Sequence, residues 1–273
     1  MMKADYSFPR GVLNAATGKD KFALSRFQPS TPLQLFIEHY WVVRYDLHGE
    51  EPYTQTVLTY PNVHLAFEHD IMGRRSLIYG ILKRPFVRKL EGSGRVLGVK
   101  FRAGGFYPYW KRDVSLLTGT VIEASEVFGP GVREWMDCVL DASDDAAMAR
   151  QADLAFLNKL PERDAQAEQA DDIVQTTMND RTIIKVEQLC RQTGLSIRQL
   201  QRLFHKYIGV TPKWVIKRFR LQEAAERLEQ GENVPLADLA MQLGYFDQSH
   251  FIKDFKSVIG QSPEAYRQSC NLS

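Results

Sequence analysis

The stretch that decides the fold begins at residue 236 and reads LADLAMQLGYFDQSHFIKDFK, and the chain continues at residue 260 with GQSPEAYR. The apolar spacing predicts a short helix over Leu236 to Leu243, and Gly244 suits the left-handed conformation that ends such a helix. A second helix then begins near Asp247, a good N-cap, and runs to Ile259. Two helices joined by a tight glycine turn have the helix-turn-helix plan.

The same plan occurs a second time, earlier in the chain. Residues 189–194 (LCRQTG) match residues 239–244 (LAMQLG) at an offset of 50, whereas the later anchors match at an offset of 51: Phe204 with Phe255, Gly209 with Gly260 and Pro212 with Pro263. One residue has therefore been added in the second copy, near the start of its later helix. The first copy predicts helices over Lys185 to Thr193 and from after Ser196 to Ile208. In each copy a Thr-Pro or Ser-Pro pair, Thr211-Pro212 or Ser262-Pro263, then supplies an N-cap followed by proline at the first helical position, which starts a further helix.

The later helix of each copy has one apolar and one polar face. The inward residues are Leu200, Leu203, Phe204 and Tyr207 in the first copy, and Phe251, Ile252 and Phe255 in the second. The outward residues are Arg198, Gln201, Arg202, His205 and Lys206 in the first, and Gln248, Ser249, His250, Lys253 and Lys256 in the second. Such side chains can reach base edges in the major groove of DNA. The alternative is an α-helical bundle whose polar faces only meet water.

Charge is distributed unevenly along the chain. The net charge is only +2, so the whole chain is not a polybasic nucleic-acid binder. From Leu195 to Arg220, however, seven basic residues occur and no acidic one. A charge run alone also fits a solvated helix face, but a basic window beside two copies of one helical plan favours DNA binding.

With these residues the sequence resembles the AraC/XylS family of transcriptional regulators over about residues 173–269. The order Gly-Tyr-x-Asp-Gln-Ser-His-Phe, then Phe-Lys, then Gly-x-Ser-Pro-x-x-Tyr-Arg is highly specific. The resemblance implies seven helices, with Trp214 to Glu229 joining the two units. It implies that bases are read by Arg198, Gln201 and Arg202 in the first unit and by Ser249, His250 and Lys253 in the second. Asp247 and Asp254 dilute the charge of the second helix, so we expect the first unit to contribute more.

Double-stranded promoter or operator DNA is therefore the expected partner, with RNA polymerase as a further one. Two units in one chain can enter successive major grooves about 34 Å apart, so binding does not require a homodimer. Whether the protein forms a homodimer is left open by the sequence. The residues expected at DNA phosphates are Lys206, Thr211, Lys213 and Lys256. The resemblance implies a ligand-responsive activator that is not an enzyme.

The N-terminal part reads as β-rich. The predicted strands are Ile37 to Tyr45, Thr56 to Tyr60, Val63 to Glu68, Ser76 to Ile81, Phe86 to Leu90 and Val96 to Phe101. Many short strands suggest a barrel or sandwich, and the resemblance favours a cupin-like β-barrel. Helical spacing follows over Val132 to Ala142 and Asp144 to Leu160, and Pro161 to Asp172 reads as an exposed linker or solvated helix. We predict an α+β multidomain protein, with a β-rich sensing or dimerisation domain over residues 1–165 and an all-α double helix-turn-helix domain over residues 171–273.

The N-terminal part offers little chemistry. His39, His64 and His69 could ligate a metal, but no His-x-His pair with a glutamate at cupin spacing occurs, so we expect no metal and no cofactor. The aromatic residues Tyr40, Trp41 and Trp110 could line a ligand pocket, although core packing is their commoner fate. Two alternatives stay open: a cupin-like small-molecule enzyme with an appended DNA-binding region, and a regulator controlled by protein partners instead of a ligand.

The cellular setting is also predicted. Cys138, Cys190 and Cys270 are far apart and have no zinc spacing, which indicates reduced thiols. The sequence starts without the apolar region of a signal peptide, and no apolar run approaches the roughly 18 residues of a membrane span. We therefore expect a cytoplasmic protein without membrane contact.

Overall fold

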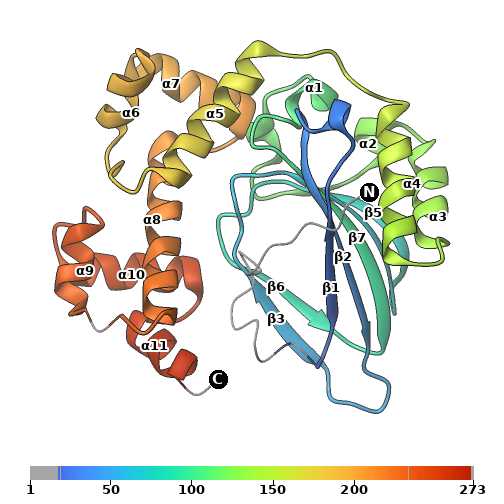
Figure 1. The fold of residues 1–273 in the computed structure, drawn as a ribbon, viewed down its shortest axis with the longest axis horizontal. Helices are drawn as coiled ribbons and strands as arrows, with labels where there is room; N and C mark the ends of the chain where they lie inside the picture. Colours follow the sequence, from blue (N-terminus) through green and yellow to red (C-terminus); the bar gives the residue numbers. More distant parts are fainter. Residues whose placement is uncertain (1–17, 19, 233, 272–273) are drawn as a thin grey trace.

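The strands of the N-terminal part form two antiparallel sheets. The computed structural model of the protein describes residues 18, 20–232 and 234–271, which Figure 1 shows as a ribbon. The larger sheet has the order β1-β2-β7-β4-β5-β8, and the smaller one pairs β3 with β6. The strands are β1 (Ala23–Phe27), β2 (Ile37–Asp46), β3 (Tyr53–Val57), β4 (His64–Asp70), β5 (Gly73–Tyr79), β6 (Phe86–Leu90), β7 (Ser93–Phe101) and β8 (Val121–Glu123). Strands β1 and β8 have no counterpart among the predicted strands.

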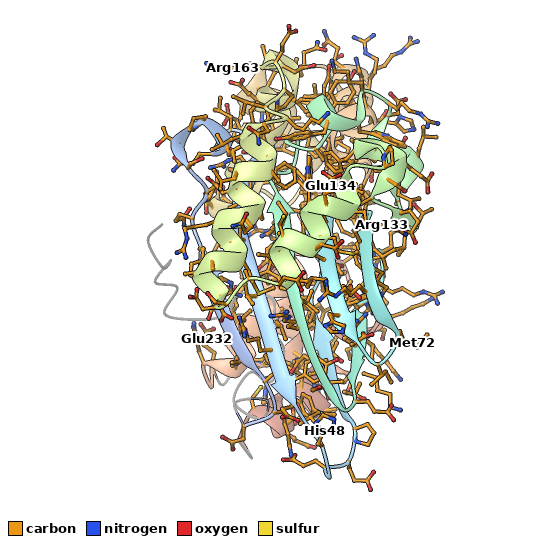
Figure 2. All side chains as sticks on the ribbon, turned by 90° about the vertical axis from the view of Figure 1, so that its right-hand side faces the viewer. His48, Met72, Arg133, Glu134, Arg163 and Glu232 are labelled. Atoms are coloured by element: carbon orange, nitrogen blue, oxygen red, sulfur yellow. The ribbon has the colours of Figure 1, made fainter. Side chains whose placement is uncertain are left out.

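The larger sheet does not close on itself. In the described part of the chain, β1 pairs only with β2 and β8 only with β5, so the closed barrel predicted from the sequence is wrong, whereas the α+β class is confirmed. The physical reason is that α3 (Val132–Leu140) and α4 (Asp145–Leu157) lie across one face of the sheet, as Figures 1 and 2 both show. These helices bury the apolar face that a closed barrel would turn inward.

Side chains alternate between the two faces of the larger sheet. The residues under α3 and α4 are apolar and fully buried, among them Phe67, Leu97 and Val99. Tyr40 points the same way, and its hydroxyl donates a 3.1 Å hydrogen bond to Asp153 of α4. The opposite face is more polar: Glu68 of β4 accepts a 2.8 Å hydrogen bond from Arg88 of β6. This ion pair ties the smaller sheet to the larger one.

The rest of the chain is mostly helical. Short helices come first: η1 (Thr31–Leu33), α1 (Tyr107–Trp110), η2 (Val114–Leu117) and α2 (Ser125–Phe128). The later helices are α5 (Ala165–Asn179), α6 (Val186–Thr193), α7 (Ile197–Leu203), the π-helical turn η3 (Phe204–Ile208), α8 (Pro212–Glu229), α9 (Leu236–Gln242), α10 (Gln248–Ile259) and α11 (Pro263–Asn271). None of the helices in the described ranges is long and apolar enough to cross a membrane.

The segment predicted as an exposed linker or solvated helix is largely the first half of α5. Its residues Ala167, Ala170 and Asp171 are buried, which corrects the prediction of exposure. Alanine side chains are small enough to let the α5 backbone approach the turn at Gly104, where an added Cβ would lie 2.1 Å from the Ala167 carbonyl oxygen. The alanine-rich composition thus reflects close packing of α5.

The helices of the C-terminal part pack against the sheet domain, and Figure 1 shows them on the side of the sheet opposite α3 and α4. Asp171 of α5 accepts a 3.0 Å hydrogen bond from the backbone N–H of Ala103. Arg218 of α8 donates to the carbonyl and hydroxyl oxygens of Thr59, at 2.6 and 2.7 Å. One apolar core runs from the sheet into the first helix-turn-helix unit, and a second core joins α8 to α9, α10 and α11 and includes Leu58.

Candidate DNA-binding interface

The first helix-turn-helix unit consists of α6 and α7. Gly194 ends α6 in the left-handed conformation, with a φ of 71°. The Ser196 hydroxyl accepts a hydrogen bond from the backbone N–H of Gln199, and the Gln199 side chain accepts one from the backbone N–H of Ser196. This reciprocal cap fixes the first turn of α7 and hence the directions of its side chains. The outward residues of α7 are exposed: Arg198, Gln201 and Arg202.

The C-terminal end of α7, which η3 continues, faces the sheet domain. There η3 packs against η2. The Lys206 ammonium lies 5.0 Å from the centre of the Tyr107 ring, and its interactions with Tyr107 and Tyr207 raise the pKa of Lys206. His205 Nδ1 lies 3.5 Å from the Asp113 carboxylate. Lys206, which the sequence predicts at a DNA phosphate, therefore contacts the N-terminal part of its own chain in this structure.

The second unit consists of α9 and α10. Gly244 between them has a φ of 84°. The Asp247 carboxylate caps α10 and accepts a 2.8 Å hydrogen bond from the backbone N–H of His250. Phe251 and Phe255 of α10 are fully buried against the second core. The predicted base-reading residues of α10 are exposed: Ser249, His250 and Lys253.

Of the two acidic residues expected to dilute the charge of α10, Asp247 is exposed at the N-cap, whereas Asp254 is mostly buried but lies 3.4 Å from His250 Nε2 on the outward face. Asp247 is occupied in capping the helix, and Asp254 is 9% exposed. Asp254 accepts hydrogen bonds from Lys217 of α8 at 2.8 Å and from the Tyr245 hydroxyl at 3.2 Å. Burial and the nearby Asp254 charge raise the pKa of Tyr245, which keeps this hydroxyl protonated as a donor. Sequence reasoning missed this tie because its partners lie on α8 and in the turn.

The predicted phosphate contacts other than Lys206 lie on the surface. Thr211, Lys213 and Lys256 are exposed. Thr211 also caps α8, and its hydroxyl accepts a 3.2 Å hydrogen bond from the backbone N–H of Trp214. The basic window from Leu195 to Arg220, which has no acidic residue, is less exposed than its sequence suggests. Arg218 and Arg220 are only 3% and 2% exposed, so part of the basic charge is internal.

The candidates in the N-terminal part other than His69 have partners within that part of the chain. His39 is buried, and burial lowers its pKa. His64 Nδ1 accepts a 3.4 Å hydrogen bond from the indole N–H of Trp41, and the indole N–H of Trp110 donates to the Asp113 carbonyl oxygen at 3.4 Å. His69 is exposed and faces away from His64 across the sheet, because the two are five residues apart on one strand. Within residues 18, 20–232 and 234–271, no three His, Cys, Asp or Glu side chains are grouped to hold a metal ion.

Two helix-turn-helix units joined by one long helix define a class of DNA-binding domain. Residues 189–269 match the family model described as a helix-turn-helix domain, and residues 25–123 match a domain of unknown function (DUF6597). The C-terminal region is an AraC-type helix-turn-helix domain, which confirms the family predicted from the sequence.

Several regulators are similar to this region. An uncharacterized HTH-type transcriptional regulator from Haemophilus influenzae is 37% identical over 100 residues, which are 37% of this chain and 32% of that protein. The HTH-type transcriptional activator AarP from Providencia stuartii is 34% identical over 86 residues, or 32% of this chain and 63% of AarP. The chain thus covers less than two thirds of the length of these relatives. The solved structure of ToxT from Vibrio cholerae O395 matches 92% of this chain and 99% of ToxT, with 11% identity and a TM-score of 0.40.

Proposed function

We propose that this protein is a sequence-specific DNA-binding regulator of transcription. The observation that carries the proposal is that the second helix of each unit exposes the polar residues predicted to read bases, while its apolar face is buried. Arginine and glutamine on α7 can make bidentate hydrogen bonds to guanine and adenine. We propose that α7 and α10 enter adjacent major grooves, about 34 Å apart. One chain then occupies both half-sites, and binding does not require a homodimer.

The proposed direction of regulation is activation. AarP and the relative RhaS from Pectobacterium atrosepticum, which is 33% identical over 79 residues, are named transcriptional activators. RNA polymerase is the partner that activation requires. We also propose that the sensing domain comprises residues 1–165 and the DNA-binding domain residues 171–273, with the first half of α5 as the connection between them.

Replacement of Arg202 by alanine should weaken binding to the preferred site by about 1 to 3 kcal/mol and relax the preference at one base position. The reason is that the exposed guanidinium of Arg202 can form two hydrogen bonds to one guanine. Lys213, in contrast, is proposed to contact a phosphate, so Lys213→Ala should weaken binding to all sequences alike. Hydroxyl-radical footprinting on DNA upstream of the protein's own gene, with titrations at several salt concentrations, measures both effects. The wild type should protect two patches about one helical turn apart on one face.

The matched control for this experiment is Arg133→Ala. Arg133 is exposed on α3, which lies on the side of the sheet opposite the helices of the C-terminal part (Figure 1). This variant should keep the wild-type footprint. If Arg202→Ala also keeps the wild-type affinity and sequence preference, α7 does not read bases and the proposed docking is wrong. If the DNA upstream of the gene is not protected, the same footprinting is carried out on sites that the wild type selects from random-sequence DNA.

We further propose that the regulator responds to a small molecule bound between the sheet domain and the helices. A cavity of about 70 Å³ lies there. Lys100 and Glu38, 2.9 Å apart, line its polar side, and Val174, Met178 and Phe219 line its apolar side. A molecule in this cavity contacts α5 and α8 together, so it can change how the helices pack on the sheet.

A thermal-shift screen of small metabolites tests this response. A molecule that binds the cavity should raise the melting temperature of the wild type and change its DNA affinity. The same molecule should have no effect on Val174→Trp, whose indole fills the cavity. A molecule that stabilises both proteins equally binds elsewhere, and the cavity is then not the sensing site.

A further inference from the structure

Phe246 is the most exposed large apolar side chain among the described residues. Its relative exposure is 103%, and the next highest value is 79%, for Met72 in a hairpin turn. Phe246 directly precedes Asp247, the N-cap of α10. A whole aromatic ring in water therefore stands at the start of the second recognition helix.

An apolar residue directly before an N-cap usually packs against its own helix, but the Phe246 ring does not have this structural role. Such a residue commonly packs against the fourth residue of the helix, which is Phe251 in α10. Here Tyr245 makes that contact instead, with ring centres 5.4 Å apart, and it is anchored by its hydrogen bond to Asp254. Because Tyr245 fills the structural position, the Phe246 ring is left in solvent.

The turn of the second unit is one residue longer than the turn of the first unit. One residue, Leu195, separates Gly194 from the N-cap Ser196, and Leu195 is half-buried against the main core. In the second unit, two residues separate Gly244 from the N-cap, and the second of them is Phe246. Phe246 is therefore the residue that the second copy has gained. It stands at the N-terminal end of α10, the end of a recognition helix that contacts base edges.

We propose that Phe246 is a specificity-determining residue that contacts the 5-methyl group of a thymine in the major groove bound by α10. This inference rests on the proposed DNA-binding function. Thymine carries the one apolar group that bases present in this groove, and phenylalanine is among the side chains that pack on it. Ser249 and His250, two and three residues after the N-cap, are also exposed in the first turn of α10 and supply polar contacts to neighbouring bases. The contact covers apolar surface that folding leaves in water.

The experiment uses the full chain and DNA sites selected from a random-sequence library. Each thymine of the selected site is replaced in turn by uracil, which removes only the methyl group. One such replacement, in the half-site of the second unit, should lower wild-type affinity about fourfold, as expected for one buried methyl group. The same replacement should leave the affinity of Phe246→Ala unchanged.

The matched control is Met241→Ala. Met241 is also apolar and 69% exposed, but it lies on α9 and not at the start of the recognition helix. This variant should keep the wild-type response to uracil. If Phe246→Ala responds like the wild type at every thymine, the inference is wrong, while specific binding by both proteins leaves the proposed function intact.

Two other outcomes also decide the question. If Phe246→Ala keeps the wild-type affinity and uracil response but no longer activates transcription, the ring contacts a protein and the assignment to thymine is overturned. If the wild-type chain selects no DNA sequence, the proposed function fails and this inference fails with it. Circular dichroism of both variants verifies that the exposed substitutions leave the helices folded.

Discussion

Replacing Arg220 with alanine should lower the free energy of unfolding by about 3 to 5 kcal/mol. Arg220 is 2% exposed, and its guanidinium donates hydrogen bonds to the carbonyl oxygens of Thr177 at 2.8 Å and Asp180 at 3.3 Å. It also pairs with Glu223, whose side chain is 12% exposed. Alanine would leave this carboxylate nearly buried without its closest partner and would remove the guanidinium from the Thr177 carbonyl, whereas the Asp180 carbonyl keeps the backbone N–H of Ile183. A buried charge that loses its partner is strongly destabilising.

Urea unfolding, followed by circular dichroism, measures this loss. Arg181→Ala is the matched control, because Arg181 faces the same Glu223 at 4.0 Å but has a side chain that is 62% exposed. An exposed ion pair contributes about 0 to 1 kcal/mol, so this control should unfold almost like the wild type. If Arg220→Ala is as stable as Arg181→Ala, Arg220 does not hold α5 and α8 together.

The helix caps are the features that the sequence predicts best. Ser196, Thr211 and Asp247 are predicted as N-caps, and the side chain of each accepts a hydrogen bond from a backbone N–H three residues further on. A cap depends on residues within one helical turn, so its chemistry is contained in a short stretch of sequence. For the same reason the predicted helices of both units agree closely with α6, with α7 continued by η3, and with α9 and α10.

Buried charges could not be predicted in this way. Arg218 and Arg220 belong to an acid-free basic window, which by itself predicts a surface. The partner of Arg218 is Thr59, which is 159 residues away in the chain, and Thr177, a partner of Arg220, is 43 residues away. Only the packing of α8 against the sheet domain and α5 brings these groups together. The closure of the barrel failed as a prediction for a related reason, since it depends on which elements cover the sheet.

The candidate interface could be predicted in part. Helical spacing separates the outward from the inward residues of α7 and α10, and all six predicted base-reading residues are exposed. That they read bases stays a prediction. The position of Lys206 over Tyr107 could not be predicted, because Tyr107 lies about a hundred residues earlier in the chain, beyond the reach of local patterns. For Phe246 a signal existed in the sequence, namely the change of offset between the copies, and the structure adds that its ring is exposed whereas Tyr245 packs against Phe251.

Replacing Gly104 with alanine should also destabilise the protein, by about 1 to 3 kcal/mol. The new Cβ would lie 2.1 Å from the carbonyl oxygen of Ala167, and a backbone atom cannot move aside as a side chain can. Helix α5 must therefore shift away from the turn, which strains the hydrogen bond from the Ala103 N–H to Asp171. Gly131→Ala is the matched control, because an added Cβ at Gly131 meets nothing within 4 Å.

The shift of α5 should also loosen the end of α7 and the turn η3 that continues it. The side chain of Gln166 on α5 accepts a 2.8 Å hydrogen bond from the Tyr207 hydroxyl in η3, which directly continues α7. One helix thus connects the sheet domain, through Asp171, with the end of α7, through Gln166. In Gly104→Ala, amide hydrogen exchange should become faster at Ala103 and throughout η3, and should stay unchanged in α9, α10 and α11, which belong to the second core. Unchanged exchange in η3 would mean that α5 does not transmit movement of the sheet domain to α7. The response to a bound molecule would then have to pass through the contact between Thr59 and α8.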